Sequence, residues 1–164
     1  MNKEEKAKKF LKLVDILEKL RGEHGCPWDK KQTHKTLMKY LFEEANEYNQ
    51  AVEKQDYDNM KEELGDVLLQ IIFHAQIAKE NKKFDIYDVL DSINEKMIRR
   101  HPHVFGNSKA KTEEEIRIEW EKIKAEEKLK KNRRLDAWKD RGTETSFGIV
   151  DNIKVYKYNN CVHK

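Results

Sequence analysis

YLFEEANEYNQAVEKQDYDNMKEELGDVLLQIIFH, residues 40–74, is the stretch from which the fold of this chain can be predicted. Its apolar residues recur at the three- and four-residue spacing of helices, with one break near Asp56. Six of the nine carboxylates in this stretch gather in two short clusters: Glu43, Glu44, Glu47, Glu62, Glu63 and Asp66. Burying an ionised carboxylate without a partner costs on the order of several kcal/mol, so cations are expected opposite these groups.

The same periodicity extends outward from this stretch. It predicts helices over about residues 4–20, 34–54, 57–80, 87–100 and 112–131. Thr33, Asp56 and Asp85 are suited to cap three of them, and Thr112 with Glu115 forms a capping box for the last. The segments around 21–29 and 101–108 contain glycine and proline and are predicted to be loops. The chain should therefore form an all-α bundle of about five helices.

Composition supports one helical domain. The chain has 164 residues, 40% of them charged and 37% hydrophobic, with only 2 Pro and 6 Gly. This mixture suits long amphipathic helices with hydrated outer faces. No apolar run approaches the ~18 residues that a membrane span needs. Cys26 and Cys161 form no short-spaced metal pair or disulfide framework, so we expect a reduced cytoplasmic protein.

Charge is unevenly distributed along the chain. Residues 128–164 contain ten Lys/Arg and four Asp/Glu, which leaves the preceding part mildly acidic. A basic tail could contact nucleic acid, but a solvated terminus is the commoner explanation, and we expect no nucleic acid partner. We assign residues 1–131 to the helical domain and residues 132–164 to this tail, in which Ile153 and Val155 could belong to a loop or a short strand.

A helical wheel separates the carboxylates of the helix predicted over 34–54. Placed at about 100° per residue, Glu44 interrupts the apolar face and Glu47 lies beside it. Glu43 lies further round, toward the surface. The helix predicted over 57–80 is apolar in nearly every direction and needs partners on every side. A band of about 80° on that helix collects its polar residues: Glu63, Asp66, Gln70 and His74.

Carboxylate oxygens are the ligands that Mg²⁺, Mn²⁺ and Ca²⁺ prefer in proteins. Lys or Arg partners could instead neutralise these acids. A di-iron bundle would need Glu-x-x-His on two helices, but none of the six histidines has Glu three positions before it. The sequence therefore favours a site for hard divalent ions.

Five ordered motifs resemble the MazG family of all-α nucleoside triphosphate pyrophosphohydrolases. They are GCPWDK (25–30), EELGD (62–66), FHAQ (73–76), RRHPHVFG (99–106) and WEKIK (120–124), and the resemblance covers about residues 10–131. It implies hydrolysis of a nucleoside triphosphate to the monophosphate and pyrophosphate. It also implies a MazG-like bundle completed by dimerisation, as a homodimer or a dimer of dimers.

The resemblance also implies roles for individual residues. Mg²⁺, or Mn²⁺, would be held by Glu44, Glu47, Glu63 and Asp66. Lys96 and Arg100 would bind the phosphates, and Trp120 and Lys124 would complete the nucleotide site. From the residues alone, Trp28 and Trp120 could stack on the base or simply pack, and packing or loop ordering is favoured for Trp28, which stays a substrate-binding candidate.

Residue chemistry agrees with this assignment but leaves the proton acceptor open. A carboxylate not fully used as a metal ligand could accept the proton of an attacking water, and Glu43, Glu47 and Glu63 are all candidates beside Glu44. Lys96 and Arg100 lie one helical turn apart and could clamp a triphosphate. His101 and His103, which flank a proline, are expected to be structural.

The chain departs from the family pattern after about residue 131. Many family members continue into a second, related domain, which suggests that this is a single-domain or truncated form. The principal alternative to an enzyme is a catalytically silent helical module that binds nucleotides or proteins. Base preference, and the choice between standard and damaged nucleotides, are open from sequence.

Overall fold

The computed structural model describes residues 1–139, with side chains through residue 133. The described residues form an all-α fold, as predicted. The helices are α1 (Lys3–Arg21), α2 (Pro27–Lys31), α3 (His34–Lys54), α4 (Tyr57–Glu80), α5 (Ile86–Arg100), α6 (Pro102–Phe105) and α7 (Glu113–Lys139). The chain divides into two compact units, Met1–Arg99 and Arg100–Lys164.

Helix starts follow the predicted capping residues. Thr33 accepts a hydrogen bond from the backbone N–H of Thr36, and Asp56 accepts one from Asn59. Thr112 and Glu115 bond reciprocally at the start of α7, which confirms the predicted capping box. These caps satisfy N–H groups that have no partner within the first helical turn.

Two predicted loops are partly wrong, because each contains a short helix. Pro27 begins α2 and Pro102 begins α6. Proline suits the first turn of a helix, where its missing N–H is not needed and its fixed φ is already helical. The last helix also extends beyond its predicted end near residue 131, to Lys139.

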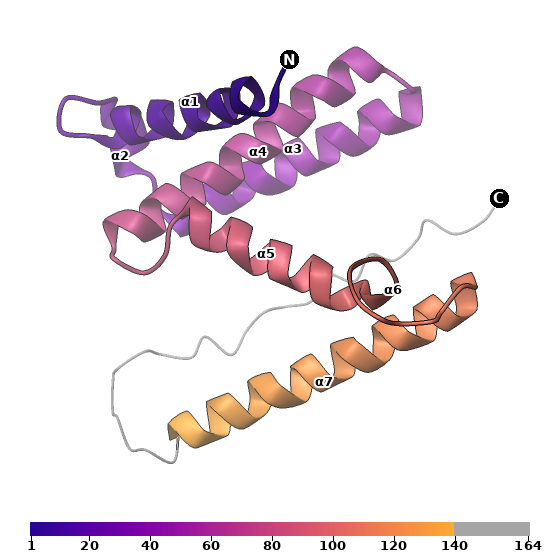
Figure 1. The fold of residues 1–164 in the computed structure, drawn as a ribbon. Coiled ribbons are helices and arrows are strands. Elements are labelled where there is room, and N and C mark those ends of the chain that lie inside the picture. Colours follow the sequence, from indigo (N-terminus) through magenta and orange to yellow (C-terminus); the bar gives the residue numbers. More distant parts are fainter. Residues whose placement is uncertain (140–164) are drawn as a thin grey trace. The chain divides into compact units, whose positions relative to one another are not determined.

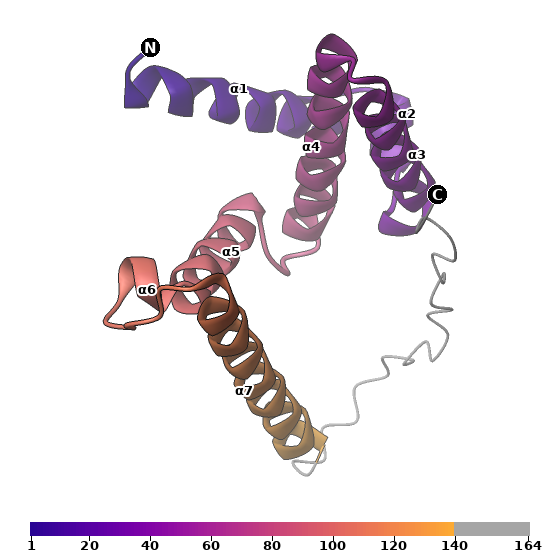
Figure 2. The same ribbon diagram turned by 90° about the vertical axis from the view of Figure 1, so that its right-hand side faces the viewer.

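α3 and α4 form an antiparallel hairpin, which is the centre of the first unit (Figures 1 and 2). The turn between them uses Gln55 in the left-handed region, at φ 55° and ψ 32°. Asp56 then caps α4 immediately, so the chain reverses within two residues. This turn sets the register in which the acids of α3 face those of α4.

α1 packs against α4 and completes the core of the first unit (Figure 1). The buried cluster is drawn from α1, α3, α4 and the first residue of α5: Val14, Leu17, Leu37, Ile72, Phe73, Ala75, Ile77 and Ile86. α4 supplies half of these residues, as expected for a helix that is apolar in most directions. Its remaining apolar side, with Leu64, Leu68 and Ile71, stays exposed.

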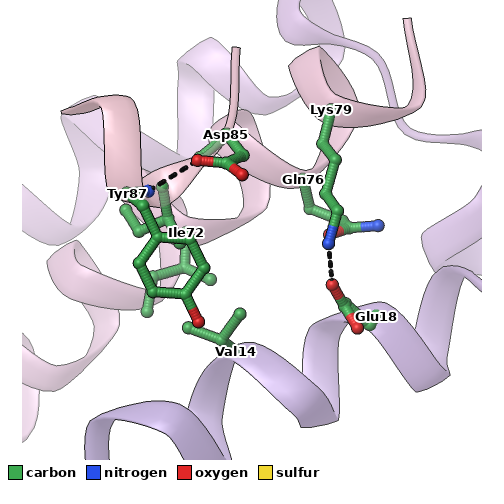
Figure 3. A pocket seen from close by; sticks show the side chains of 9 residues that line it. Val14, Glu18, Ile72, Gln76, Lys79, Asp85 and Tyr87 are labelled. Carbon is green, nitrogen blue, oxygen red and sulfur yellow. Dashed lines mark hydrogen bonds and ion pairs between the residues drawn. The ribbon is translucent and has the colours of Figure 1, made fainter. Parts of the chain in front are cut away.

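A small pocket lies where α1, α4 and the start of α5 meet (Figure 3). Lys79 forms an ion pair with Glu18 at its edge, and Asp85 accepts the backbone N–H of Tyr87 at 2.8 Å. Asp85 therefore caps α5, as predicted. The cavity measures about 10 Å³, which is about the space for one water molecule. This pocket is therefore too small for a nucleotide, and the residues around it pack the three helices together.

The described part of the second unit contains α6 and α7. No described helix is long and apolar enough to cross a membrane. Ile153, Val155 and Cys161 lie outside the described residues, as does most of the predicted basic tail.

Candidate active site

Three carboxylates from the α3–α4 hairpin converge. Glu44 comes from α3, and Glu63 and Asp66 come from α4, three residues apart and therefore on one face. One oxygen atom from each lies within 4.8 Å of the others. Glu63 is only 8% exposed, and the other two side chains are half-buried. We call these three residues the carboxylate triad.

Burial and repulsion from neighbouring carboxylates act on Glu44 and Glu63 in the same direction. The pKa of Glu44 is raised from its ordinary value, first by desolvation and then by the charges of Asp66, Glu47 and Glu63. The pKa of Glu63 is raised by desolvation, by the charges of Glu47 and Asp66, and by a hydrogen bond with Glu47. The folded protein therefore holds negative charge here at a cost that a bound cation would relieve.

The triad's surroundings suit a divalent cation. Among the described residues, no Lys or Arg forms an ion pair with Glu44, Glu63 or Asp66. In the described structure, these acids are therefore not neutralised by basic side chains. Three converging carboxylates with no basic partner form an oxygen donor set of the kind that Mg²⁺ and Mn²⁺ prefer.

The other predicted carboxylates lie around the triad. Glu47 is exposed and lies outside it, although close enough to hydrogen-bond Glu63. Glu43 and Glu62 are also exposed, and their charges contribute to the raised pKa values of Glu44 and Glu63 respectively. Glu47 is thus placed as a neighbour of the triad, and its predicted role as a ligand stays a prediction.

Trp28 is displayed by α2 and is 52% exposed. Its ring forms a T-shaped contact with the ring of Tyr40, with 6.0 Å between centroids and 63° between planes. Tyr40 lies one helical turn before Glu44 on α3, so Trp28 is tied through it to the helix that carries a triad residue. Half of the indole is nevertheless free for another contact, which keeps both predicted roles of Trp28 open.

Arg21, which sequence reasoning missed, anchors α2. Its guanidinium donates two hydrogen bonds to the carboxylate of Glu80, at 2.8 and 2.7 Å, and others to the backbone carbonyls of Asp29 and Gln32. It also lies 5.4 Å from the ring centroid of Phe73. The side chain is only 6% exposed. A lone arginine at a predicted helix end carries no sequence signal for such a network.

Two further polar groups of α4 continue the stripe that contains Glu63 and Asp66. Gln70 is 7% exposed, and its Oε1 has no hydrogen-bond partner in the described structure. His74 stacks on His34 with the rings 5.1 Å apart and their Nδ1 atoms at 2.8 Å. The pKa of His74 is lowered, first by desolvation and then by the charge of His34.

The second unit brings three predicted substrate-binding residues together. Trp120 has the Arg100 guanidinium 5.3 Å from its ring centroid and the Lys124 ammonium 4.6 Å from it. Arg100 also donates to Glu127 at 3.1 and 2.7 Å, which partly satisfies its charge. Such cation–π contacts hold both cations in defined positions. Lys96 lies on α5 in the first unit and is half-buried.

The histidines that flank Pro102 do not gather a metal-binding group. The His101 and His103 rings lie 5.7 Å apart and are tilted by 56°. Within the described chain, the triad is the one group of three or more ligand-type side chains that converges closely enough for a metal ion.

Comparison with known proteins identifies the family of this chain. Residues 32–105 match the MazG nucleotide pyrophosphohydrolase domain. The crystal structure of a mazG-related protein from Thermotoga maritima superposes with a TM-score of 0.59 at 32% sequence identity, over 70% of this chain and 97% of that chain. This chain belongs to the MazG family. The matched domain of this MazG chain contains the whole triad and Arg100, whereas Trp120 and Lys124 lie beyond it.

Longer MazG relatives carry activity names. The nucleoside triphosphate pyrophosphohydrolase/pyrophosphatase MazG of Thermotoga maritima is 56% identical over 122 residues, which are 74% of this chain and 46% of that protein. The nucleoside triphosphate pyrophosphohydrolase of Escherichia coli K12 is 45% identical over 121 residues, covering 73% of this chain and 46% of that protein. This MazG chain thus spans about half the length of the curated relatives it matches.

Proposed function

We propose that the chain hydrolyses nucleoside triphosphates to the monophosphate and pyrophosphate, with divalent metal ions held by Glu44, Glu47, Glu63 and Asp66. The observation that carries the proposal is the carboxylate triad, which is partly buried, repels itself and has no basic partner in the described structure. Mg²⁺ bound there, or Mn²⁺, would neutralise phosphate charge and lower the pKa of an attacking water.

In this proposal a water oxygen attacks the α-phosphorus, and the bond from that phosphorus to the bridging oxygen breaks. Pyrophosphate leaves with the electron pair of that bond, and a carboxylate accepts the proton of the water. Glu47 is the first candidate for this role, because it is exposed and lies outside the triad, so its carboxylate need not be fully used as a metal ligand. Glu43 is exposed beside Glu44 and is the second candidate.

We assign nucleotide binding to the predicted cations and aromatic rings. Lys96, Arg100 and Lys124 would bind phosphate oxygens, since charge-assisted hydrogen bonds to phosphate are strong. Arg100 would share its donors between the phosphates and Glu127. Trp120, which already holds two cations, and Trp28, half of whose ring is free, would contact the rest of the nucleotide. Modified or damaged nucleotides are included among the proposed substrates.

The decisive experiment is product analysis with Mg²⁺ across a panel of standard, deoxy- and oxidised nucleoside triphosphates. Equimolar monophosphate and pyrophosphate are expected, with activity lost on chelation. Release of orthophosphate and diphosphate would contradict cleavage at the α-phosphorus. Tight nucleotide binding without any product would instead support the catalytically silent module.

A homodimer is proposed on a separate observation. Five of the exposed large apolar side chains of α3 and α4, each between 37% and 63% exposed, are assigned to one face: Met38, Phe42, Leu64, Leu68 and Ile71. Met38 of α3 and Ile71 of α4 line one cleft, so the exposed apolar residues of the two helices adjoin at these two positions. An exposed apolar face of this kind is typical of an association surface.

Cys26 is a free thiol, which suits the proposed cytoplasmic location.

Exchanging Phe42 and Leu68 for glutamate should convert the dimer into a monomer, because two charges would be desolvated in the interface. Light scattering after size-exclusion chromatography measures the change. Ile16→Glu on α1, at a residue 43% exposed, is the matched control and should leave the dimer intact. A wild-type protein that is monomeric at micromolar concentration would contradict this interface.

A further inference from the structure

Gln70 is buried in the α4 helix but lacks a partner for its side-chain carbonyl. The residue is 7% exposed, and no described group donates a hydrogen bond to Oε1. A buried carbonyl without a donor destabilises a folded protein, so such atoms are uncommon and call for an explanation.

Gln70 adjoins the proposed catalytic groups. It follows Asp66 by four residues on α4, which is about one turn, or about 6 Å along the helix axis. Residues at this spacing share a helix face, so Gln70 continues the face that carries Glu63 and Asp66. His74 extends the face by another turn, and its Nε2 is also buried without a partner, while its Nδ1 is used by His34.

The chemistry of this face restricts what can satisfy Gln70. Its Oε1 needs an N–H or O–H donor, and ionised carboxylates supply none. Phosphate groups of a nucleotide are likewise acceptors when ionised. The donors of a nucleotide are therefore the hydroxyl groups of its sugar and the amino and ring N–H groups of its base, all on the nucleoside side of the α-phosphorus.

We infer that Gln70 is a specificity-determining residue, whose Oε1 accepts a hydrogen bond from a sugar hydroxyl or a base amino group of the bound nucleoside triphosphate. This inference rests on the proposed function, because the triad must hold the phosphates for the nucleoside to reach the next turn of α4. It assigns to α4 both the phosphate end and the nucleoside end of the substrate.

The test compares Gln70→Met with Gln76→Met, the same change on the same helix. Gln76 is bonded to Glu80 at 3.1 Å and lies away from the proposed contact, in the small pocket between α1 and α4. For each protein, kcat/KM is measured with ATP, dATP, 2′,3′-dideoxy-ATP and ITP. Dissociation constants of the corresponding α,β-methylene analogues and the melting temperature are measured in parallel.

Wild type and Gln76→Met should disfavour one of the donor-lacking nucleotides by about tenfold, as expected for one neutral hydrogen bond. Gln70→Met should lose this discrimination while keeping or raising its melting temperature, because it removes an unsatisfied buried group. Loss at the dideoxy or deoxy nucleotide would identify a sugar hydroxyl as the donor, and loss at ITP would identify the base amino group.

Three results would overturn the inference. One is a Gln70→Met variant that equals wild type on every nucleotide. Another is a uniform loss with discrimination retained, which would indicate a structural role. The third is a wild type indifferent to all of these donors. If wild type binds the analogues but hydrolyses nothing, the proposed activity fails, while the binding panel still decides the role of Gln70.

Discussion

Replacing Glu63 with glutamine should abolish nucleoside triphosphate hydrolysis and, in the absence of metal, raise the melting temperature. The side chain is 8% exposed and its carboxylate repels Glu47 and Asp66, so neutralising it removes an unfavourable charge with almost no change of shape. Loss of groups that merely orient metal ligands costs about 10–100-fold in affinity or activity, so loss of a ligand charge should cost at least about 100-fold.

Without metal, Glu63→Gln should have the higher melting temperature, and with bound metal the wild type should have the higher one. A ligand that binds only the folded state stabilises it in proportion to the logarithm of its concentration over the dissociation constant. Millimolar Mg²⁺ should therefore raise the melting temperature of the wild type and have much less effect on Glu63→Gln. Differential scanning fluorimetry with and without Mg²⁺, beside a pyrophosphate release assay, measures both effects.

The pH dependence of stability provides an independent test of the role of Glu63. Its pKa is raised above the ordinary 4.5, so the folded state takes up this proton before the unfolded state does. The penalty of the charged group is therefore present at neutral pH and disappears as the pH falls through the raised pKa toward 4.5. The gain in melting temperature from Glu63→Gln should be largest near pH 7–8 and absent below about pH 4.5.

Glu62→Gln is the matched control for these measurements, because it makes the same change at the adjacent but exposed residue. It should alter hydrolysis only slightly and show no reversal with Mg²⁺. Full activity in Glu63→Gln, or a melting temperature lowered at neutral pH without metal, would contradict the site as assigned.

Replacing Arg21 with methionine should lower the free energy of unfolding by about 2–4 kcal/mol, since a nearly buried guanidinium with several hydrogen bonds is lost. The substitution leaves Glu80 without its ionic partner and the Gln32 carbonyl without a donor, while the Asp29 carbonyl keeps only the backbone N–H of Gln32. Because the hydrogen bonds of Arg21 hold α2 in place, and Trp28 lies on α2, the packing of Trp28 on Tyr40 should loosen as well. Urea unfolding and tryptophan fluorescence measure the two effects.

Arg117→Met provides the comparison for Arg21→Met. Arg117 makes a similar two-bond contact with Glu114, at 3.2 and 2.8 Å, but both side chains are about two-thirds exposed. Exposed pairs contribute little, so a loss below about 0.5 kcal/mol is expected there. If both substitutions lowered the free energy of unfolding equally, the burial of Arg21 would not be the source of its larger contribution.

The Arg21 contribution should also depend on pH in the opposite sense to that of Glu63. The pKa of Glu80 is lowered, chiefly by its hydrogen bond with Arg21. The stability from this pair is therefore present above the ordinary value of 4.5 and is lost as the pH falls toward the lowered pKa. The difference between wild type and Arg21→Met should shrink below about pH 4.5.

Helices were predictable from the sequence because their causes are local. The bounds of α3 and α4 agree with those predicted from periodicity and from the caps Thr33 and Asp56. The short helices that begin at Pro27 and Pro102 were missed for an equally local reason. Proline next to glycine-containing segments indicates a loop, but proline also suits the first position of a helix.

The candidate site was predictable only in part. The wheel placed Glu44 on the inner face of α3, and Glu63 and Asp66 on one stripe of α4, and the structure brings the three within 4.8 Å. The wheel also placed Glu47 beside Glu44, but in the structure Glu47 lies outside the triad. Whether two acids on different helices meet depends on the register and crossing of those helices, which no pattern within either helix specifies.

By itself, then, the sequence determined that the chain is helical, where its long helices begin, and which carboxylates share a helix face. Only the tertiary structure decided which of them converge, that Gln70 is buried without a donor, and that Arg21 reaches Glu80 across 59 positions. The physical reason is range. Caps and periodicity act between neighbours of one helix, whereas burial and charge pairing depend on which helix surfaces pack together.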